Sequence, residues 1–577
     1  MYSDGLAGGV VRGRVRIDRR RDGRIEYARG APHEHERNEG DDDAEPDPQL
    51  ARAATGVRTA RLALAPLLKA PLLLTPLAAR RDRHLTSEYP HKLVAVTVRV
   101  RFAPSPTGSL HIGSVRTTLY NYFFARQNKG KLILRIEDTD QDRLVAGAVD
   151  SIYDGLSWMG VSWGEGPREG GPHAPYIQSE RLPRYQQAAQ QLVANGAAYL
   201  CFCSKERLAA LRAQQAANKQ MTRYDRHCRS TPPAEAAERA KTEPHVIRLK
   251  VPDDGTIGVD DLVYGRIEWP IETIEDQVLL KSDGFPTYHL AVVVDDHEMG
   301  ITQIFRGEDW LPSTPKHLLV YRAFGWTIPP IAHFPNVLGA DGKKLAKRHG
   351  ATKVEQFRAD GYLPEAMVNY LALIGWAPGT EEEVFSMDDL SARWRIDQVQ
   401  KAGGKWDRDR LDWFNGVWIR KLADEDLLSR LEPFLPAEWD RAVLTRALPI
   451  MRERMRTLVE GRELVRFLFT DGFTYEVGAL VPKKQDRGGA AGALARATAA
   501  LRDTRPFEHA QIEAALRKVA DELGWHIKEV SHVVRAATMG GPVGLPLFES
   551  LALLGTERTM TRLERAAATI GEGPQHA

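Results

Sequence analysis

The strongest constraint on the fold is a strand, a loop and a helix in succession near residue 100. Residues 98–103 alternate apolar side chains with arginine, a pattern that predicts a β-strand. Residues 104–109 are rich in proline and glycine, so neither a strand nor a helix continues there. From about His111, apolar side chains recur at helical spacing. This succession is typical of an open α/β sheet, in which free backbone N–H groups at the helix start attract an anion such as phosphate.

The composition is that of an ordinary globular protein with several domains. The chain has 577 residues, of which 43% are hydrophobic and 27% charged, a length typical of about three or four domains. Basic and acidic side chains number 79 and 77, so bulk charge does not indicate a nucleic-acid partner. Three cysteines exclude a disulfide scaffold and favour a reducing, cytoplasmic compartment. The best candidate for a membrane span, residues 62–79, holds three prolines and Lys69, so we expect no membrane association.

Several separated blocks carry a resemblance to one family. Residues 101–113 read Arg-Phe-Ala-Pro-Ser-Pro-Thr-Gly-Ser-Leu-His-Ile-Gly, and further matching blocks occupy residues 135–140, 171–181, 286–290, 306–310 and 546–550. Over about residues 96–570 the chain resembles the class I aminoacyl-tRNA synthetases, in their glutamyl form. The resemblance implies a ligase that forms glutamyl-AMP from L-glutamate and ATP with Mg²⁺, and then esterifies the terminal adenosine of tRNA(Glu). It also implies a monomer that needs bound tRNA for the first step.

The resemblance places the catalytic groups on two loops. It implies catalytic roles for His111, Gly113, Lys344 and Lys347. The ATP-binding residues that it implies are Pro104, Thr107, Gly108, His111, Gly113, Ser114, Glu308 and Lys347. A lysine aimed at the α-phosphate stabilises the negative charge that builds as pyrophosphate leaves, and Lys347 matches that position with Lys344 as its helper. Ala346 replaces the serine that is usual in the family, and we expect activity to survive this change.

A pocket for glutamate needs guanidinium groups for two carboxylates and a carboxylate for the ammonium. Charged residues at or near the ends of three predicted strands meet this requirement, and surface ion pairs are the alternative reading. The resemblance implies that the residues contacting glutamate are Arg101, Ser105, Glu137, Tyr288 and Arg306. Among them Arg306 is expected to bind the side-chain carboxylate. Val292 stands where some relatives have asparagine, which removes one polar group beside the pocket.

All three cysteines lie in one short segment, as Cys201, Cys203 and Cys228. A structural zinc site needs four ligands in a tetrahedral array. The fourth ligand comes from Tyr224, His227 or Ser230. Some family members have histidine where Ser230 stands, and others use a tyrosine spaced as Tyr224 is from Cys228. The resemblance therefore implies Cys201, Cys203, Tyr224 and Cys228 as ligands of a structural Zn²⁺, with three buried free cysteines as the alternative.

The predicted fold is α/β at the start and all-α at the end. We expect a disordered extension at 1–95, with a translation start near Val96 as an alternative. The other segments are a Rossmann-type catalytic domain at 96–180 and 285–340, an inserted acceptor-binding domain at 181–284, a stem-contact domain with the lysine loop at 341–415, and an α-helical anticodon-binding domain at 416–577. Within the last segment, Gly488 to Gly492 predicts a loop or insertion.

The sequence leaves two questions about function open. The enzyme either charges tRNA(Glu) alone or also glutamylates tRNA(Gln). Further alternatives are a catalytically silent tRNA-binding paralogue, a tRNA-independent adenylyltransferase, which the long helical C-terminal part also opposes, and the short relative that modifies a tRNA base. The long helical C-terminal part argues against the short relative, and retention of His111, Gly113, Lys344 and Lys347 argues against the silent one.

Overall fold

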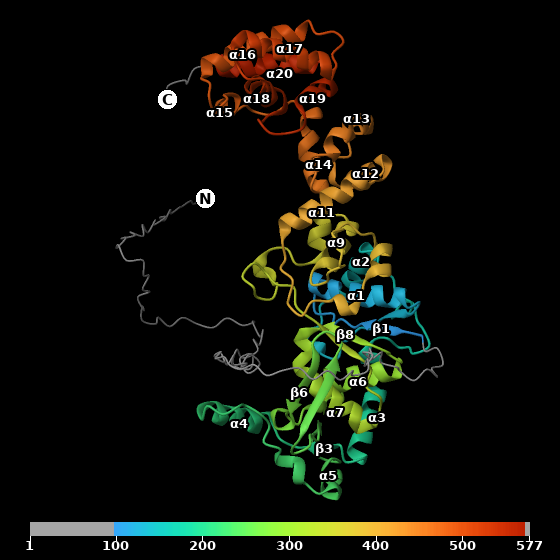
Figure 1. Cartoon of the computed structure of the whole chain (residues 1–577). Helices are drawn as coiled ribbons and strands as arrows, with labels where there is room; N and C mark the ends of the chain where they lie inside the picture. The colour runs from blue at the N-terminus through green and yellow to red at the C-terminus, as the bar shows by residue number, and fades with distance from the viewer. Residues whose placement is uncertain (1–96, 572–577) are drawn as a thin grey trace, which may run out of the picture. The chain divides into compact units, whose positions relative to one another are not determined.

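A computed structural model describes residues 97–571 of the chain (Figure 1). The extension predicted at 1–95 lies outside these residues. Among the helices of residues 97–571, none is long and apolar enough to cross a membrane. The strands are β1 (Arg99–Phe102), β2 (Lys131–Leu134), β3 (Ala198–Cys201), β4 (Val246–Leu249), β5 (Thr256–Asp261), β6 (Gly265–Pro270), β7 (Val278–Leu280), β8 (Ile304–Gly307) and β9 (Ile331–Phe334).

Helices occur throughout residues 97–571, and after β9 every further element is helical. The first are α1 (Ile112–Gln127), α2 (Ala148–Trp158), α3 (Leu182–Ala194), α4 (Lys205–Ala217), α5 (Pro233–Arg239), α6 (Tyr288–Glu298), α7 (Thr314–Phe324), α8 (Val354–Ala359), α9 (Pro364–Leu373) and α10 (Met387–Arg393). They are followed by α11 (Arg408–Lys421), α12 (Asp424–Leu431), α13 (Arg441–Arg452), α14 (Leu458–Val465), α15 (Val477–Leu480), α16 (Arg487–Arg502), α17 (His509–Leu523), α18 (Ile527–Met539), α19 (Leu547–Leu554) and α20 (Thr556–Gly571).

Short 3-10 helices connect these elements. They are η2 (Gln141–Arg143), η3 (Gln178–Arg181), η4 (His227–Ser230), η5 (Ile271–Thr273), η6 (Glu308–Ser313), η7 (Lys347–His349), η8 (Ile396–Gln398), η9 (Glu432–Phe434) and η10 (Arg466–Leu468). Three of them carry predicted site residues, because Cys228 lies in η4, Glu308 begins η6 and Lys347 begins η7.

Parallel strands from two distant parts of the chain meet beside α1. β1 pairs in parallel with β2, and β8 pairs in parallel with β9. The backbone N–H of Thr302 donates to the carbonyl of Arg99 at 2.9 Å, which brings β8 beside β1. The strand predicted at 98–103 and the helix predicted from about His111 are therefore confirmed as β1 and α1. The split α/β domain follows, because its two halves meet between β1 and β8 (Figure 1).

The segment between the two halves contributes two different sheets. β3, β4 and β7 form an antiparallel sheet that α3 covers, and β5 and β6 form a hairpin. This hairpin joins the sheet of the second half, where Asp261 in β5 pairs with Ile331 in β9. The Asp261 carboxylate also accepts the backbone N–H of His333 at 3.0 Å. Strand pairing thus crosses the boundary predicted at residue 284.

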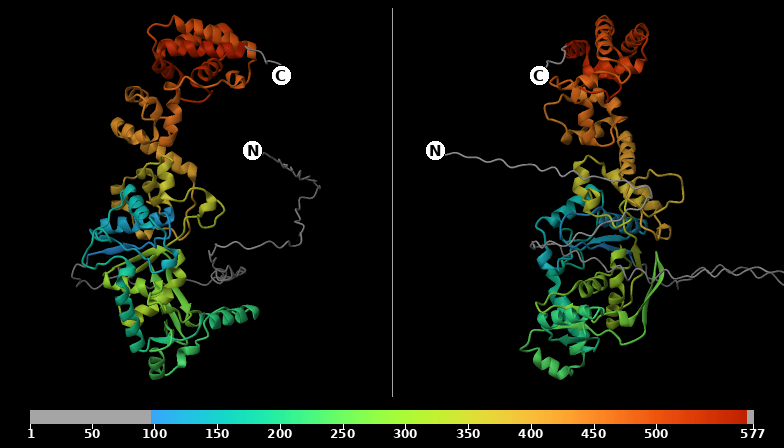
Figure 2. Two further views of the ribbon diagram at one scale, coloured as in Figure 1. Left: turned by 180° about the vertical axis from the view of Figure 1, so that it is seen from behind. Right: turned by 90° about the vertical axis from the view of Figure 1, so that its left-hand side faces the viewer.

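The hydrophobic cores do not coincide with the predicted domain boundaries, because two of them join sheets and helices from more than one predicted segment. One core runs from β1 and α1 through α9 and α11 to α14, so the helical segment after the lysine loop shares its interior with the first half. A second core joins α3, β4 and β7 to α6 and α7. A separate core begins at Leu480 and holds α16 to α20 together. Figure 2 shows the ribbon of these helices, at the red end of the colour bar, in two further views.

The loop predicted at Gly488 to Gly492 is wrong, because these residues lie inside α16. Asp486 caps the helix by accepting the backbone N–H of Gly489 at 2.7 Å. Alanines in and after the glycine run favour the helix, and Ala490 is fully buried in the C-terminal core. Packing and capping therefore outweigh the conformational freedom of the glycines.

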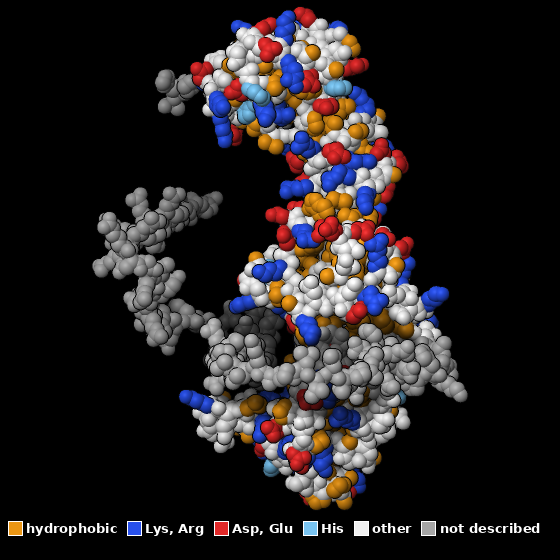
Figure 3. All heavy atoms as spheres, viewed as in Figure 1, with side chains coloured by type: hydrophobic (Ala, Val, Ile, Leu, Met, Phe, Trp, Pro, Cys, Tyr) orange, Lys and Arg blue, Asp and Glu red, His pale blue; other side chains and the backbone are white. Residues whose placement is uncertain are grey.

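Charge of both signs is interspersed on the surface. In the face shown in Figure 3, lysine and arginine side chains alternate with aspartate and glutamate. Arg408 pairs with Asp360 at 3.1 Å, and Arg410 pairs with Glu383. The near balance of charge in the sequence thus holds on the face shown in Figure 3, and acidic neighbours compensate Arg408 and Arg410.

Candidate active site

A cavity of about 950 Å³ lies at the carboxyl ends of β1 and β8, beside the start of α1. Open α/β sheets bind their ligands at this place. The cavity is lined by most of the predicted substrate-binding residues: Arg101, Pro104, Ser105, Thr107, Gly108, His111, Gly113, Ser114, Glu137, Tyr288, Arg306 and Lys344. Glu308 and Lys347 are not among the lining residues. Both Glu308 oxygens are engaged, one with the backbone N–H of Asn336 at 2.8 Å and one with the hydroxyl of Tyr264 at 2.5 Å.

His111 forms the N-cap of α1 and lines the cavity. Its Nδ1 accepts the backbone N–H of Gly113 at 3.0 Å, so the neutral ring carries its proton on Nε2. Burial, and then the positive charge of Lys344, lower the pKa of His111. An added Cβ at Gly113 would lie 3.2 Å from His111 Nδ1, so glycine lets this ring sit over the first turn. The arrangement leaves the Nε2–H donor for a ligand oxygen.

The expected free N–H groups at the start of α1 are already bonded, so that prediction is wrong. The N–H of Ile112 donates to the carbonyl of Thr352 at 3.0 Å, and that of Gly113 donates to His111. A segment far along the chain covers the first helical turn, and local sequence does not show such a contact. The preceding loop keeps its predicted dependence on glycine, because Gly108 has a φ of 146° that disfavours other residues.

The lysine loop brings one of its two predicted catalytic lysines to the cavity. Lys344 lines the cavity, and its Nζ lies 2.6 Å from Oδ2 of Asp309. Lys347 begins η7, is exposed, and forms no ion pair with the residues that the structure describes. The backbone N–H of Ala346 donates to Nδ1 of His349 at 3.0 Å, so the His349 side chain closes this turn without the missing serine hydroxyl. The roles of both lysines stay predictions.

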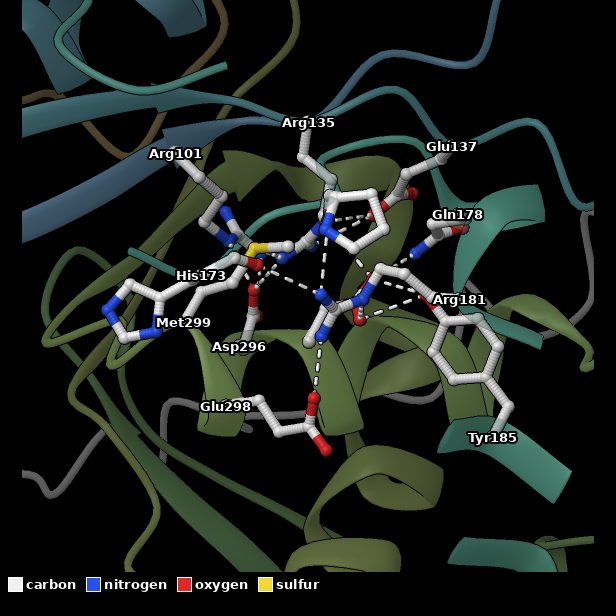
Figure 4. Close-up of polar contacts among 12 residues, drawn as sticks. Arg101, Arg135, Glu137, His173, Gln178, Arg181, Tyr185, Asp296, Glu298 and Met299 are labelled. Carbon is white, nitrogen blue, oxygen red and sulfur yellow. Dashed lines mark hydrogen bonds and ion pairs between the residues drawn. The ribbon is translucent and has the colours of Figure 1, made fainter. Parts of the chain in front are cut away.

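Buried charges link two of the predicted glutamate contacts (Figure 4). Arg101 donates from Nε and Nη2 to the two oxygens of Asp296 at 3.0 and 3.1 Å. Arg135 donates from Nη1 to Asp296 at 2.8 Å and from Nη2 to Glu137 at 2.9 Å. All four side chains are buried. The cation expected to bind a substrate carboxylate is therefore connected to the carboxylate expected to bind the ammonium.

A second carboxylate extends this network away from the cavity. Asp295 accepts hydrogen bonds from Arg181 Nε at 2.7 Å, from Gln178 at 2.8 Å, and from the Tyr185 hydroxyl at 2.9 and 2.8 Å. Arg181 continues to Glu298 at 2.6 Å (Figure 4). Each buried acid of the Asp295–Asp296 pair thus has cationic partners, as a buried carboxylate requires.

Glu137 has one engaged and one free oxygen. Oε1 accepts both hydrogen bonds from Arg135, and Oε2 forms no hydrogen bond with any residue of the described range. Burial raises the pKa of Glu137, against the lowering effect of Arg135. A carboxylate oriented through one oxygen, with the other directed to no protein partner, suits a ligand ammonium group.

Arg306 differs from Arg101 and Arg135 because its hydrogen-bond partners are all neutral. Nε donates to Nε2 of His333 at 3.0 Å, Nη1 to Nδ1 of His317 at 3.0 Å, and Nη2 to the hydroxyl of Thr314 at 2.8 Å. The Tyr288 hydroxyl lies 3.5 Å from Nη1. Within residues 97–571 this guanidinium forms no ion pair, and burial lowers its pKa. An uncompensated buried cation favours an anionic ligand.

Several residues that hold the site were not predicted from the sequence. Asp295 and Asp296 end a run of apolar residues on α6, which is the one sequence signal that could have indicated buried acids. Arg135 stands in a strand-like run, and His317 follows a Thr-Pro-Lys sequence on α7. His333 is fully buried in β9. Their hydrogen-bond partners lie in distant segments of the chain. The periodic pattern of apolar residues in the sequence does not predict such contacts.

The three cysteine sulfurs lie within 4.8 Å of one another. Sγ of Cys203 is 3.5 Å from that of Cys228, and the Tyr224 hydroxyl lies 3.3 Å from Cys201 and 3.6 Å from Cys203. Tyr224 is buried in this cluster, and its oxygen accepts the backbone N–H of Cys228 at 3.0 Å. The Arg248 guanidinium lies 3.9 Å from the centre of the Tyr224 ring. Three sulfurs and one oxygen are a donor set that zinc accepts.

Comparison with known proteins agrees with this geometry. Residues 97–413 match the catalytic domain of class I tRNA synthetases (E and Q), and residues 426–567 match an anticodon binding domain. The chain therefore belongs to the class I tRNA synthetases of the E and Q family, and the predicted resemblance and fold class are confirmed.

Individual relatives match over most of their length. A glutamate–tRNA ligase of Dehalococcoides mccartyi is 44% identical over 485 residues, which cover 83% of this chain and 98% of the relative. One of Roseiflexus castenholzii is 43% identical over 489 residues, covering 82% and 96%. A crystal structure of a glutamate tRNA ligase from Elizabethkingia meningosepticum in complex with its amino acid superposes with a TM-score of 0.73 at 34% identity, covering 82% of this chain and 100% of that one.

Proposed function

We propose that the chain attaches glutamate to tRNA(Glu) in two steps. The observation that carries this proposal is the pairing of an uncompensated buried cation, Arg306, with a half-free carboxylate, Glu137, in one cavity. Glutamate supplies the complementary charges, with its side-chain carboxylate toward Arg306 and its ammonium toward Glu137. Arg101 is the cation for the α-carboxylate, and Ser105 and Tyr288 complete the set of glutamate contacts.

The first step is attack of the α-carboxylate on the α-phosphorus of ATP. A new carboxyl O–P bond forms as the bond to the β-phosphate oxygen breaks, and pyrophosphate leaves. His111 donates Nε2–H to a phosphate oxygen, Lys344 adds positive charge at the cavity, and Lys347 joins it when the loop binds ATP. In the second step a hydroxyl oxygen of the terminal adenosine attacks the acyl carbon and the bond from that carbon to the phosphate oxygen breaks. AMP leaves, and the hydroxyl proton passes to its phosphate.

ATP brings Mg²⁺, which neutralises charge on its phosphate oxygens. The remaining ATP contacts lie on the loop after β1 and at the start of α1, as Pro104, Thr107, Gly108, Gly113 and Ser114. Both oxygens of Glu308 are engaged with Tyr264 and Asn336, so its contact with ATP stays a prediction from the family resemblance.

The cysteine cluster is a structural zinc site in this proposal. Cys201, Cys203, Cys228 and Tyr224 supply the ligands, and the close approach of the Tyr224 oxygen to two sulfurs supports tyrosine as the fourth one. Zinc would hold β3 and η4 together. The segment around them meets the acceptor end of the tRNA, residues 416–577 bind the anticodon, and the enzyme works as a monomer.

The test is charging of purified tRNA(Glu) and tRNA(Gln), in parallel, with labelled glutamate and ATP. Labelled tRNA(Glu) with release of AMP and pyrophosphate supports the proposal. Charging of tRNA(Gln) as well identifies an enzyme that does not discriminate between the two tRNAs. Absence of label on both tRNAs, with folded protein, contradicts the proposal and supports a silent paralogue.

A further inference from the structure

The contacts of Arg306 fix the protonation of two buried histidines. A guanidinium only donates hydrogen bonds, so each ring nitrogen that faces Arg306 must carry a lone pair. The proton of His333 is therefore on Nδ1, which donates to Oδ2 of Asp261 at 2.7 Å. The proton of His317 is on Nε2, which donates to Nδ1 of His289 at 3.1 Å. Each acceptor is thus oriented by a second hydrogen bond on its far side.

These histidines orient Arg306 without cancelling its charge. The His317 and His333 side chains are buried, and each bond to Arg306 is 3.0 Å long. The nearby buried acid, Asp296, is occupied by Arg101 and Arg135. The protein therefore fixes the position of this guanidinium by hydrogen bonds, and a ligand has to supply the negative charge that compensates it.

We propose that His317 is a positioning residue that determines the amino-acid specificity of the reaction. Its neutral Nδ1 holds the guanidinium of Arg306 in place, and the full positive charge remains for the side-chain carboxylate of the substrate. This inference rests on the proposed function. Glutamine would leave the buried cation uncompensated, so the enzyme rejects it. A carboxylate in place of the imidazole would make the same hydrogen bond and abolish this selection.

Three substitutions separate the hydrogen bond from the charge. His317→Asn keeps a neutral acceptor, because Oδ1 of asparagine lies near the position of Nδ1. His317→Asp has nearly the same shape and adds a negative charge beside Arg306. His317→Leu fills much of the same volume without an acceptor. His297→Asn is the control, because His297 lies on α6 and stacks on Trp326 at 3.8 Å without contacting Arg306.

The assay measures kcat and KM for glutamate and for glutamine with saturating tRNA(Glu). We expect His317→Asn and the control to keep the wild-type preference for glutamate. His317→Leu should raise KM for glutamate about 10- to 100-fold, as for loss of a hydrogen bond to a charged group, with KM for ATP unchanged. His317→Asp should also raise KM for glutamate and lower the ratio of glutamate to glutamine kcat/KM.

The decisive comparison is between the Asn and Asp variants, which differ in charge and little in size. Equal glutamate-to-glutamine ratios in these two variants would overturn the inference, as would an unchanged KM for glutamate in His317→Leu. Thermal unfolding of each variant separates loss of fold from loss of binding. If wild type and the His297→Asn control both fail to charge glutamate, the proposed function itself is wrong.

Discussion

Replacement of Asp296 by asparagine tests whether this buried carboxylate positions the arginine that is proposed to bind the substrate. Asp296 accepts three hydrogen bonds, two from Arg101 at 3.0 and 3.1 Å and one from Arg135 at 2.8 Å. Burial by itself would raise the pKa of Asp296, but these two cations lower it below its ordinary value. Asparagine removes the negative charge and, in either amide orientation, sets an NH₂ group against an arginine donor. Breaking a buried ion pair in this way costs about 3–5 kcal/mol of folding free energy.

Asp295→Asn is the matched control for this prediction. Asp295 is equally buried and contacts Arg181, Gln178 and Tyr185, with Arg135 Nε at 3.7 Å, but it has no bond to Arg101. Both variants should therefore lose stability to urea. KM for glutamate should rise about 10- to 100-fold in Asp296→Asn alone, because there Arg101 loses the partner that orients it. The assay is charging of tRNA(Glu) over a range of glutamate and ATP concentrations. An equal KM for glutamate in both variants would refute the reasoning.

Three further predictions concern the lysine loop, the cysteine cluster and a buried histidine. Lys347→Ala should lower kcat for charging about 10²- to 10³-fold with KM for glutamate unchanged, whereas Lys343→Ala should have little effect; equal losses in both would contradict a specific role. Tyr224→Phe should weaken zinc retention against a competing chelator, whereas His227→Ala should not, and zinc-free wild type would contradict the site. Burial and two neighbouring positive charges, those of Lys316 and Arg306, lower the pKa of His289 from 6.5 to about 3. Between these values the unfolded chain binds a proton that the folded protein does not, so the free energy of unfolding falls with falling pH by up to about 1.4 kcal/mol per unit. His289→Asn should flatten that slope in urea titrations from pH 6.5 to 3, and an unchanged slope would show that His289 is protonated alike in both states.

The local elements near residue 100 could be predicted, because their signals are local. The alternation of apolar side chains with arginine predicted β1. The helical spacing of apolar residues after the proline-rich loop predicted α1. The same local reading failed at Gly488 to Gly492, where burial of Ala490 and the cap from Asp486 stabilise a helix. The glycine run by itself predicts a loop. The helix is stabilised by a cap and by buried contacts, which the composition of the run does not show.

The sequence predicted many of the residues that line the candidate site, but it did not predict the hydrogen bonds and ion pairs that hold them in place. Arg101, Glu137 and Arg306 line one cavity as the strand-end argument and the family resemblance indicated. The sequence did not indicate that Asp296 holds Arg101 or that His317 holds Arg306, since these pairs join different elements. The pairing of β5 with β9 across residue 284 was missed for the same reason.

The central claim is that an uncompensated cation at Arg306 selects an acidic side chain. The most direct measurement is the ratio of kcat/KM for L-glutamate and L-glutamine in charging of tRNA(Glu) by the wild-type enzyme. A site built around a buried, unpaired polar or charged group rejects the uncomplementary substrate by about 10⁴-fold or more. We expect a ratio of that size in favour of glutamate for the wild-type enzyme. A ratio near one, or a preference for glutamine, would contradict it.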